Sequence, residues 1–371
     1  MPRIADCLSL LDELFPPRLA EEKDPIGIQL GDPSEELRGV ATALEATLET
    51  VQAAADAGAN LLVTHHPLLF RPMARIVAGD PNGDIVRLAI ARGVTVFACH
   101  TNADWVDGGL NDRLAQTLGL RDVRPVTSRA AGDFFKVAVF TPEEALFNVA
   151  EAMFAAGGGV IGEYTKCSFR TPGTGTFLPS ENADPYSGKI GELANEAEFR
   201  LEVLVPGASR DAVVAAMISA HPYEEPAYDV YPLAAARSKH GVARVGELEA
   251  PETPRSIAAR LKKSLRLDQV RAAGPIDATV RRVALCTGGG AFLFDSMTKI
   301  EGGVYVTGDV RYHDARFAEQ INYPLLEIGH FEAEISFAEL VAEKLSAVFA
   351  AEKIGVPVRA LRIEKNPFVL L

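Results

Sequence analysis

Short apolar runs alternate with amphipathic stretches in the first third of the chain. The runs at 39–46, 61–66 and 94–100 are typical of buried strands, and the stretches at 48–58 and 84–92 have helical spacing. Strands that alternate with helices of about ten residues predict β-α-β units and a mainly parallel sheet.

The last third of the chain repeats this order. Its apolar runs at 281–286, 304–310 and 324–330 predict three further strands. The helices expected between and after them cover 291–300, 313–320 and 332–349. The two ends of the chain therefore share one architecture, although their residues show no convincing repeat.

The middle of the chain has a different pattern. The expected strands cover 134–142, 199–206 and 227–233, and the expected helices cover 143–156 and 209–220. Gly, Pro, Ser and Thr are frequent in residues 169–190, which have no apolar period, so we expect a long loop there.

These patterns predict an α/β protein with mixed α+β character. Two β-α-β-type halves, residues 1–129 and 234–371, are expected to form one domain. A small ferredoxin-like α+β domain is expected between them, over residues 130–233. With 371 residues, of which 48% are hydrophobic and 23% charged, the chain has enough apolar material for the cores of both domains.

The composition argues against several classes of partner. The formal net charge is −13, so binding to nucleic acid or to anionic membranes lacks its electrostatic driving force. The acidic, amphipathic N-terminal stretch is not typical of a signal peptide, and no run of about 18 apolar residues predicts a membrane span. The four scattered cysteines, which indicate reduced thiols, are Cys7, Cys99, Cys167 and Cys286. We therefore expect a cytoplasmic protein without nucleic-acid or membrane partners. The net charge does not exclude a local basic pocket for one phosphorylated ligand.

Histidines follow two of the expected strands at the point where each strand ends. His65 and His66 come directly after an apolar run and precede Pro67, while His100 and Asp104 follow the run that ends at residue 99. Because ligands collect at the carboxyl ends of parallel strands, both groups are expected at one edge of the sheet.

A third polar group follows a strand of the other half. His330 and Glu334 are four residues apart at the start of an expected helix, where they share one face. A histidine doublet at a strand end is more often structural than metal-bound, and an isolated His-x-x-x-Glu pair is usually solvated. The convergence of three such groups on one edge favours a metal site.

The number of these ligands indicates more than one ion. Three or more imidazoles and two carboxylates exceed the needs of one tetrahedral ion, and carboxylates can bridge two ions. The mixed nitrogen and oxygen set suits Zn, Fe, Mn or Co. We therefore expect two divalent metal ions per chain.

Three further groups have a structural alternative. The backbone of Thr287, Gly288 and Gly289, between a strand and a helix, either binds an anion or forms a tight turn. Arg311 and His313 follow another strand and either line the same cleft or begin a helix, together with Asp309, Tyr312 and Asp314. The stretch 221–225, His-Pro-Tyr-Glu-Glu, is more typical of a turn than of a second metal site.

Several strings of the sequence resemble a known family. THHPLLF, HTNADWVDGGLND, TGDVRYHDA and IGHFEAE are similar to the signatures of the Nif-three-like family, also called GTP cyclohydrolase I type 2 homologues. The strings GTGTFLP, IGELANEAEFRLEVLVP and HPYEEPAYDVYPL resemble the extra domain of the longer bacterial members, which is similar to PII and CutA proteins.

The resemblance implies a dinuclear metal centre in a toroidal homohexamer. The ligands carried over by position are His65, His66, Asp104, His330 and Glu334. His100 belongs to the same motif and is expected beside the ions, where it orients Asp104 or a bound water. The chain departs from the family's usual strings at 23–25, Lys-Asp-Pro, and at 241–244, Gly-Val-Ala-Arg, and neither departure changes a ligand.

Two functions are compatible with these residues. The first is a metal-dependent hydrolase that acts on a nucleotide or another small phosphorylated compound, with a metal-activated water as nucleophile. The second is a non-catalytic protein that holds or delivers metal, or a regulatory scaffold whose inserted domain senses a ligand. In both cases the expected partner is a small molecule.

Overall fold

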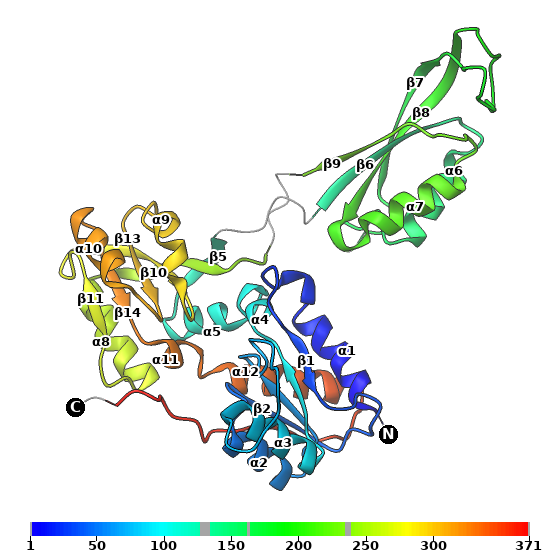
Figure 1. Cartoon of the computed structure of the whole chain (residues 1–371). Helices are drawn as coiled ribbons and strands as arrows, with labels where there is room; N and C mark the ends of the chain where they lie inside the picture. Colours follow the sequence, from blue (N-terminus) through cyan, green and yellow to red (C-terminus); the bar gives the residue numbers. More distant parts are fainter. Residues whose placement is uncertain (1, 127–133, 162–163, 234–238, 370–371) are drawn as a thin grey trace. The chain divides into compact units, whose positions relative to one another are not determined.

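Figure 1 shows the computed structural model, which describes residues 2–126, 134–161, 164–233 and 239–369. The chain divides into two compact units. Residues 1–128 and 239–371 form the first unit together, and residues 129–238 form the second, inserted unit. The range 130–233 inferred from the sequence pattern lies within this inserted unit.

The first unit contains a five-stranded sheet in the order β1-β4-β3-β2-β15 (Figure 1). Its strands are β1 Gly27–Leu30, β2 Val40–Ala43, β3 Leu61–Thr64, β4 Thr95–Ala98 and β15 Val358–Ala360. β15, β2, β3 and β4 are parallel, and β1 pairs antiparallel with β4. Every residue of β2, β3 and β4 is buried, as expected for parallel strands that are covered on both faces.

Helices cover both faces of this sheet. Apolar residues of α2 (Leu48–Asp56) and α3 (Pro81–Arg92) pack with Ala41, Leu62 and Val96. Residues of α1 (Ile4–Leu14) and α12 (Phe337–Ala351) pack with Val40, Leu61 and Val63, which point to the opposite face. The C-terminal helix α12 therefore completes a core that the N-terminal segment begins.

The second sheet of this unit has six strands in the order β11-β14-β13-β12-β10-β5. Its strands are β5 Arg121–Val126, β10 Ala243–Glu252, β11 Arg271–Ala273, β12 Val280–Cys286, β13 Gly303–Thr307 and β14 Leu325–Glu327. Only β12, β13 and β14 are mutually parallel, so this sheet is mixed rather than mainly parallel. The helices around the sheet are α5 Leu110–Thr117, α8 Pro254–Leu265, α9 Phe294–Met297 and α10 Tyr312–Gln320.

Two helices expected from the sequence are wrong in detail. The stretch 291–300 forms a 3-10 turn, Gly290–Leu293, followed by the short helix α9. The expected long helix over 332–349 is divided at residues 335–336 into α11, His330–Glu334, and α12. Apolar spacing continues through this break, which is why the pattern does not reveal it. The break makes α11 a separate turn that carries His330 and Glu334 at its two ends.

The inserted unit has the β-α-β-β-α-β order of the ferredoxin-like motif. Its elements are β6 Phe134–Thr141, α6 Leu146–Ala155, β7 Ser168–Phe177, β8 Ala194–Pro206, α7 Arg210–Ala220 and β9 Tyr228–Pro232. The antiparallel sheet has the order β7-β8-β6-β9, and residues of α6 and α7 share one core with β6 and β8.

The long loop expected over 169–190 is wrong in its first part. β7 is a strand that pairs with β8 along all ten of its residues. It lies at the edge of the sheet and most of its side chains are exposed, so it has no buried face that would produce an apolar alternation. An edge strand also tolerates Pro172 and the glycines 173 and 175, which are otherwise signals of a loop.

Candidate metal centre

The predicted ligands lie at the ends of three strands of the first unit. His65 and His66 directly follow β3, and the carbonyl of Leu44, just after β2, accepts hydrogen bonds from both of their backbone N–H groups, at 3.2 and 3.1 Å. Asp104 lies on the short helix α4, Thr101–Trp105, which follows β4. His330 begins α11 after β14. Two different sheets thus contribute strand ends to one place.

Glu334 is the centre of this arrangement. Its Oε2 lies 3.1 Å from Nε2 of His66 and 3.1 Å from Nε2 of His330, while its Oε1 lies 3.6 Å from Nε2 of His65. Asp104 completes the arrangement, with Oδ1 at 3.9 Å from the same His65 nitrogen. We call His65, His66, Asp104, His330 and Glu334 the metal cluster. The structure brings all five sequence-predicted ligands together.

The nitrogens on the far side of each imidazole are held by acceptors. The four Nδ1 partners are Cys99 O for His65 (3.0 Å), Glu45 Oε1 for His66 (2.6 Å), Asp24 Oδ1 for His100 (2.9 Å) and Asp309 Oδ2 for His330 (2.5 Å). An acceptor at Nδ1 selects the tautomer with the proton on that nitrogen, which leaves Nε2 as the metal-binding atom. The imidazoles are therefore oriented for ligation before any ion is present.

The electrostatics of the cluster show how its charges are balanced by protons. Burial opposes charging of His66, but hydrogen bonds to Glu334 and Glu45 outweigh it and raise the pKa of His66 to about 10. The hydrogen bond to Glu334 raises the pKa of His330 to about 9. Burial works against ionisation of Glu334 as well, yet the neighbouring imidazoles hold its pKa well below the usual range. Burial raises the pKa of Asp104 to about 7.

A buried nitrogen of the metal cluster has no hydrogen-bond partner among the described residues. Among the described residues, Nε2 of His65 makes no hydrogen bond, although the side chain is fully buried. The oxygens of Glu334 and Asp104 stand 3.6 and 3.9 Å away, too far for a hydrogen bond. A buried polar atom without a partner is costly, and a cation between these three atoms would compensate it. The residues therefore fit a divalent ion with mixed nitrogen and oxygen ligands.

The described residues contain three overlapping groups that could hold an ion. They are His65-Asp104-Glu334, His66-His330-Glu334 and His65-His66-His100, each with ligand atoms within 4.8 Å of one another. The chain also resembles known proteins along nearly its whole length. A profile of the DUF34/NIF3 family, described as NGG1p interacting factor 3, matches residues 2–367. The chain belongs to the DUF34/NIF3 family.

Individual relatives and solved structures match nearly the whole chain. A GTP cyclohydrolase 1 type 2 homolog of Mycobacterium tuberculosis is 38% identical over 99% of this chain and 97% of its own length. A Bacillus cereus protein related to NIF3 has a solved structure with a TM-score of 0.79 and 35% identity, covering 100% and 99% of the two chains. A solved Staphylococcus aureus protein matches with a TM-score of 0.85 at 27% identity, again over 100% and 99%.

Sequence reasoning missed two of the residues that orient the imidazoles of this NIF3-family chain. Asp24 accepts hydrogen bonds from His100 and from the backbone and hydroxyl of Thr101, so the departing string at 23–25 keeps an aspartate that holds the His100 imidazole. Glu45 holds His66 and lies two residues after β2. The rule that located the histidines, polar residues at the ends of parallel strands, would also have located Glu45.

The loop at 287–289, expected either to bind an anion or to form a tight turn, lies against the metal cluster, and its contact with an anion stays a prediction. The Thr287 hydroxyl donates to Asp104 Oδ1 at 3.2 Å, and its backbone N–H donates to Asn111. Gly288 has a φ of +61°, and a side chain there would collide with Glu334. Glycine at this position therefore leaves room for the Glu334 carboxylate.

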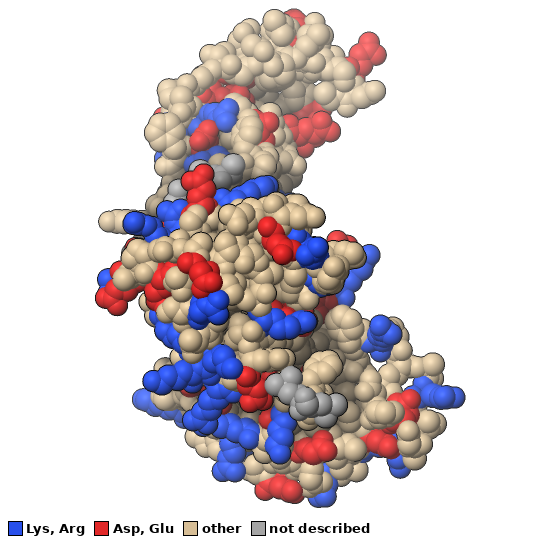
Figure 2. Space-filling model, turned by 90° about the vertical axis from the view of Figure 1, so that its left-hand side faces the viewer, with Lys and Arg blue, Asp and Glu red and all other residues tan. Residues whose placement is uncertain are grey.

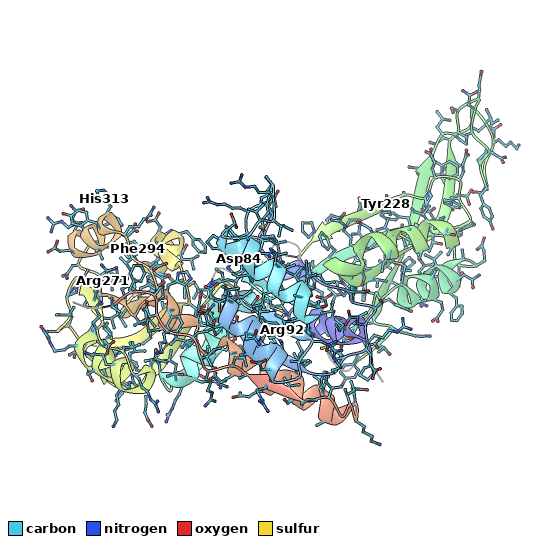
Figure 3. All side chains as sticks on the ribbon, turned by 60° about the horizontal axis from the view of Figure 1, so that its bottom comes forward. Asp84, Arg92, Tyr228, Arg271, Phe294 and His313 are labelled. Atoms are coloured by element: carbon cyan, nitrogen blue, oxygen red, sulfur yellow. The ribbon has the colours of Figure 1, made fainter. Side chains whose placement is uncertain are left out.

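Arg311 and His313 are not part of the cluster. Arg311 donates to Asp314 at 2.8 Å, and His313 is exposed on α10 (Figure 3). Neither lines the cavity beside the cluster within the described part of the chain. Their contact with a substrate stays a prediction.

A cavity of about 690 Å³ opens beside His66 and His330. One wall is the C-terminal segment from Asn366 to Val369. This segment is anchored: the Glu364 carboxylate accepts hydrogen bonds from the backbone N–H groups of Leu44 and Glu45, at 2.9 and 2.7 Å. The C-terminal segment thus supports the residue that orients His66.

Proposed function

We propose that this NIF3-family protein holds two divalent metal ions in the metal cluster and acts as a hydrolase on a small anionic compound. The observation that supports the pair of ions is the division of Glu334. Its Oε1 faces His65 and Asp104, and its Oε2 faces His66 and His330. A carboxylate whose two oxygens face two separate ligand groups is suited to bridge two ions.

Bound divalent ions would supply Lewis acidity and a water with a lowered pKa. The chain itself supplies orientation. Glu45, Asp309 and Asp24 hold their imidazoles with Nε2 toward the cluster, and Thr287 holds Asp104. Since partners of this kind fix the ligands in advance, little reorganisation is needed when the ions bind.

The walls of the cavity carry more acidic than basic residues, so positive charge for an anionic substrate has to come from the bound ions and from the surface outside the walls. Exposed Lys262, Lys263 and Arg266 directly precede the wall residues 267–269. Figure 2 shows Lys and Arg side chains gathered over the lower part of one face, although the whole chain carries a net charge of −13. A basic surface of this kind raises the local concentration of anions around it. The cavity volume, about 690 Å³, suits a nucleotide or a smaller phosphorylated compound.

A non-catalytic role in metal storage or delivery is the second candidate. The observation that favours it is the exposure of His330, whose side chain is 40% accessible. A ligand that is open to solvent allows ions to exchange with an acceptor.

For the hydrolase, the name of the relatives, GTP cyclohydrolase 1 type 2 homolog, makes GTP the first nucleotide to test.

One experiment separates the two candidates. Metal-loaded wild type, and Glu334→Gln treated with the same metal solution, are incubated with a panel of nucleotides and phosphoesters. Both proteins are also incubated separately with a metal-free zinc acceptor protein. A hydrolase gives product that depends on Glu334. Complete inactivity of the loaded wild type, with rapid transfer of its metal to the acceptor, would contradict hydrolysis and support delivery.

We further propose that the protein forms a closed hexameric ring in the cytoplasm. Closed symmetry is common in soluble homo-oligomers and would enclose the cavity beside the cluster. The buried free thiols of Cys7, Cys99 and Cys286 suit a reducing compartment. Light scattering should give about six times the chain mass of 39.7 kDa, and a stable monomer would contradict the ring.

A further inference from the structure

The inserted unit contains a cavity of its own, of about 680 Å³. Its walls are β7, the segment that follows β7, part of β8 and the turn at 223–227. Two of the strings noted in the sequence, GTGTFLP at 173–179 and HPYEEPA at 221–227, meet at these walls. We call this the aromatic cavity because Phe140, Phe177, Tyr186 and Tyr223 line it.

A buried carboxylate lies in the wall of the aromatic cavity. Glu198 on β8 is only 8% exposed. Its side chain passes over β7 at Gly175, where any larger residue would collide with the carboxylate. The Tyr223 hydroxyl hydrogen-bonds to Glu198, which fills one of about four acceptor positions of a carboxylate. A buried carboxylate with free acceptor positions favours a ligand that carries N–H donors or positive charge.

Most of the charged side chains around Glu198 are acidic. Burial, the hydrogen bond to Glu198 and the nearby carboxylates of Glu196 and Glu144 all raise the pKa of Tyr223. Glu224 and Glu225 add two exposed carboxylates to the walls. The cavity thus attracts a cation.

The basic residue of the cavity walls is already engaged. Arg200 donates to Glu202 at 2.9 Å, and its guanidinium lies 5.6 Å from the ring centre of Phe140 and 5.8 Å from that of Tyr231. Arg200 therefore does not neutralise Glu198. Its place over two rings shows that aromatic faces of this unit already hold one organic cation.

The spacing of the carboxylates argues against a bare metal ion. Among the described residues, no group of three His, Cys, Asp or Glu from this unit has its ligand atoms within 4.8 Å of one another, whereas the metal cluster has three such groups. The Ser187 hydroxyl also lines the cavity, buried and without a hydrogen-bond partner in the described part of the chain. Dispersed acceptors between aromatic rings fit a larger ion with several N–H donors.

We propose that the aromatic cavity binds a small organic cation, an amine or guanidinium on an apolar body. The charged end lies against Glu198, with Ser187 as a further acceptor, and the body packs on Phe177 and Tyr186. This site lies within the inserted unit and is independent of the hydrolase proposal.

Calorimetric titration of the full-length protein with benzylamine tests this site. Benzyl alcohol and benzoate serve as the neutral and anionic probes of similar shape. We expect saturable binding of benzylamine, at least tenfold weaker binding of benzyl alcohol, and no binding of benzoate. Glu198→Gln should weaken benzylamine at least tenfold. Glu151→Gln is the matched control, since Glu151 pairs with Lys166 and does not line the cavity.

A second variant tests the site without touching the buried charge. A Cβ on Gly173 would meet nothing within 4 Å, and its φ does not require glycine, so Gly173→Val should fold and fill the cavity. It should abolish benzylamine binding, while Glu334→Gln in the other unit should leave it unchanged. Equal binding of benzylamine and benzyl alcohol, or unchanged binding in Gly173→Val, would overturn the proposal.

Discussion

The metal cluster and the aromatic cavity both contain acidic side chains, which are close together in the cluster and far apart in the cavity. In the cluster, two carboxylates and three imidazoles converge until groups of their ligand atoms lie within 4.8 Å. In the aromatic cavity the carboxylates are distributed over walls that also carry aromatic rings. Close convergence suits a small ion with a high charge density, and dispersal suits a larger cation with a delocalised contact surface.

The two regions differ because different elements build them. The cluster stands on the ends of buried parallel strands and on the short helices α4 and α11, which hold each ligand at a fixed place. The aromatic cavity is formed by an edge strand and the segment that follows it. Rigid strand ends can hold ligands at metal-binding distances, whereas an edge strand provides an open, wider site.

The largest effect is expected from Glu334→Gln. Because Glu334 belongs to two of the ligand groups, its loss should lower the binding affinity for both ions. We expect a decrease of more than about 100-fold, because even residues that only orient metal ligands contribute about 10–100-fold to the affinity. Elemental analysis after dialysis should find close to no metal. Glu343→Gln, which removes an exposed carboxylate paired with Arg113, is the control and should retain full occupancy.

The second largest effect is expected from pH, which should change metal binding at the cluster but not benzylamine binding at the aromatic cavity. His66, with a pKa of about 10, and His330, with a pKa of about 9, must lose their protons to bind metal. Metal affinity should therefore rise from pH 6 to pH 9, by about tenfold per pH unit for each displaced proton, with measurable proton release. Benzylamine binding should stay flat from pH 6 to 8. A metal affinity that falls as the pH rises would contradict the role of these imidazoles.

The same pKa values predict the stability of the metal-free protein. Both imidazoles have pKa values above the ordinary 6.5, so their contribution is complete below pH 6.5 and is lost as the pH rises through about 9 to 10. The thermal unfolding temperature of the metal-free protein should therefore be lower at pH 10 than at pH 6.5. Bound metal should make this difference smaller.

A smaller effect is expected from the residues that orient the imidazoles. Glu45→Gln removes the charge that holds Nδ1 of His66 and should weaken metal binding 10–100-fold without abolishing it. Cobalt-loaded protein should show a changed visible spectrum. Glu49→Gln, an exposed change on the neighbouring helix α2, should leave the spectrum and the affinity unchanged.

The smallest effect concerns the C-terminal segment. Glu364→Gln keeps the shape of the side chain but weakens its hydrogen bonds to the backbone of Leu44 and Glu45. Because Glu364 makes no hydrogen bond to His66 and supports the backbone of Glu45, which does, we expect a loss of metal affinity below about tenfold. Exposed Glu352→Gln, at the end of α12, is the control. An effect of Glu364→Gln larger than that of Glu45→Gln would refute this order of dependence.

The sequence predicted the parts of the molecule whose signal is local. The buried strands β3 and β4 are continuous apolar runs. His65, His66 and His330 directly follow apolar runs, so their place at strand ends can be inferred from the sequence. β7 was not predicted because an exposed edge strand has no apolar period. Asp24 has no assigned role because a single acidic residue carries no pattern, and only the fold brings it to His100. Glu45 does follow a strand end, but only the fold shows that it orients His66.

The aromatic cavity could not be predicted for the same reason. Its walls depend on the pairing of β7 with β8, which places Glu198 opposite Gly173. The turn at 221–225 was expected as a turn, and the structure shows bends there, with Tyr223 directed to Glu198. Register and tertiary contact, which no short window of sequence contains, decide such a site.

Anomalous X-ray scattering from crystals of the metal-loaded protein tests the central claim most directly. Data collected on both sides of the absorption edge of the bound metal locate each ion. We predict two peaks per chain, about 3.5–4 Å apart, on either side of the Glu334 carboxylate. A single peak at full loading, or peaks remote from Glu334, would contradict it.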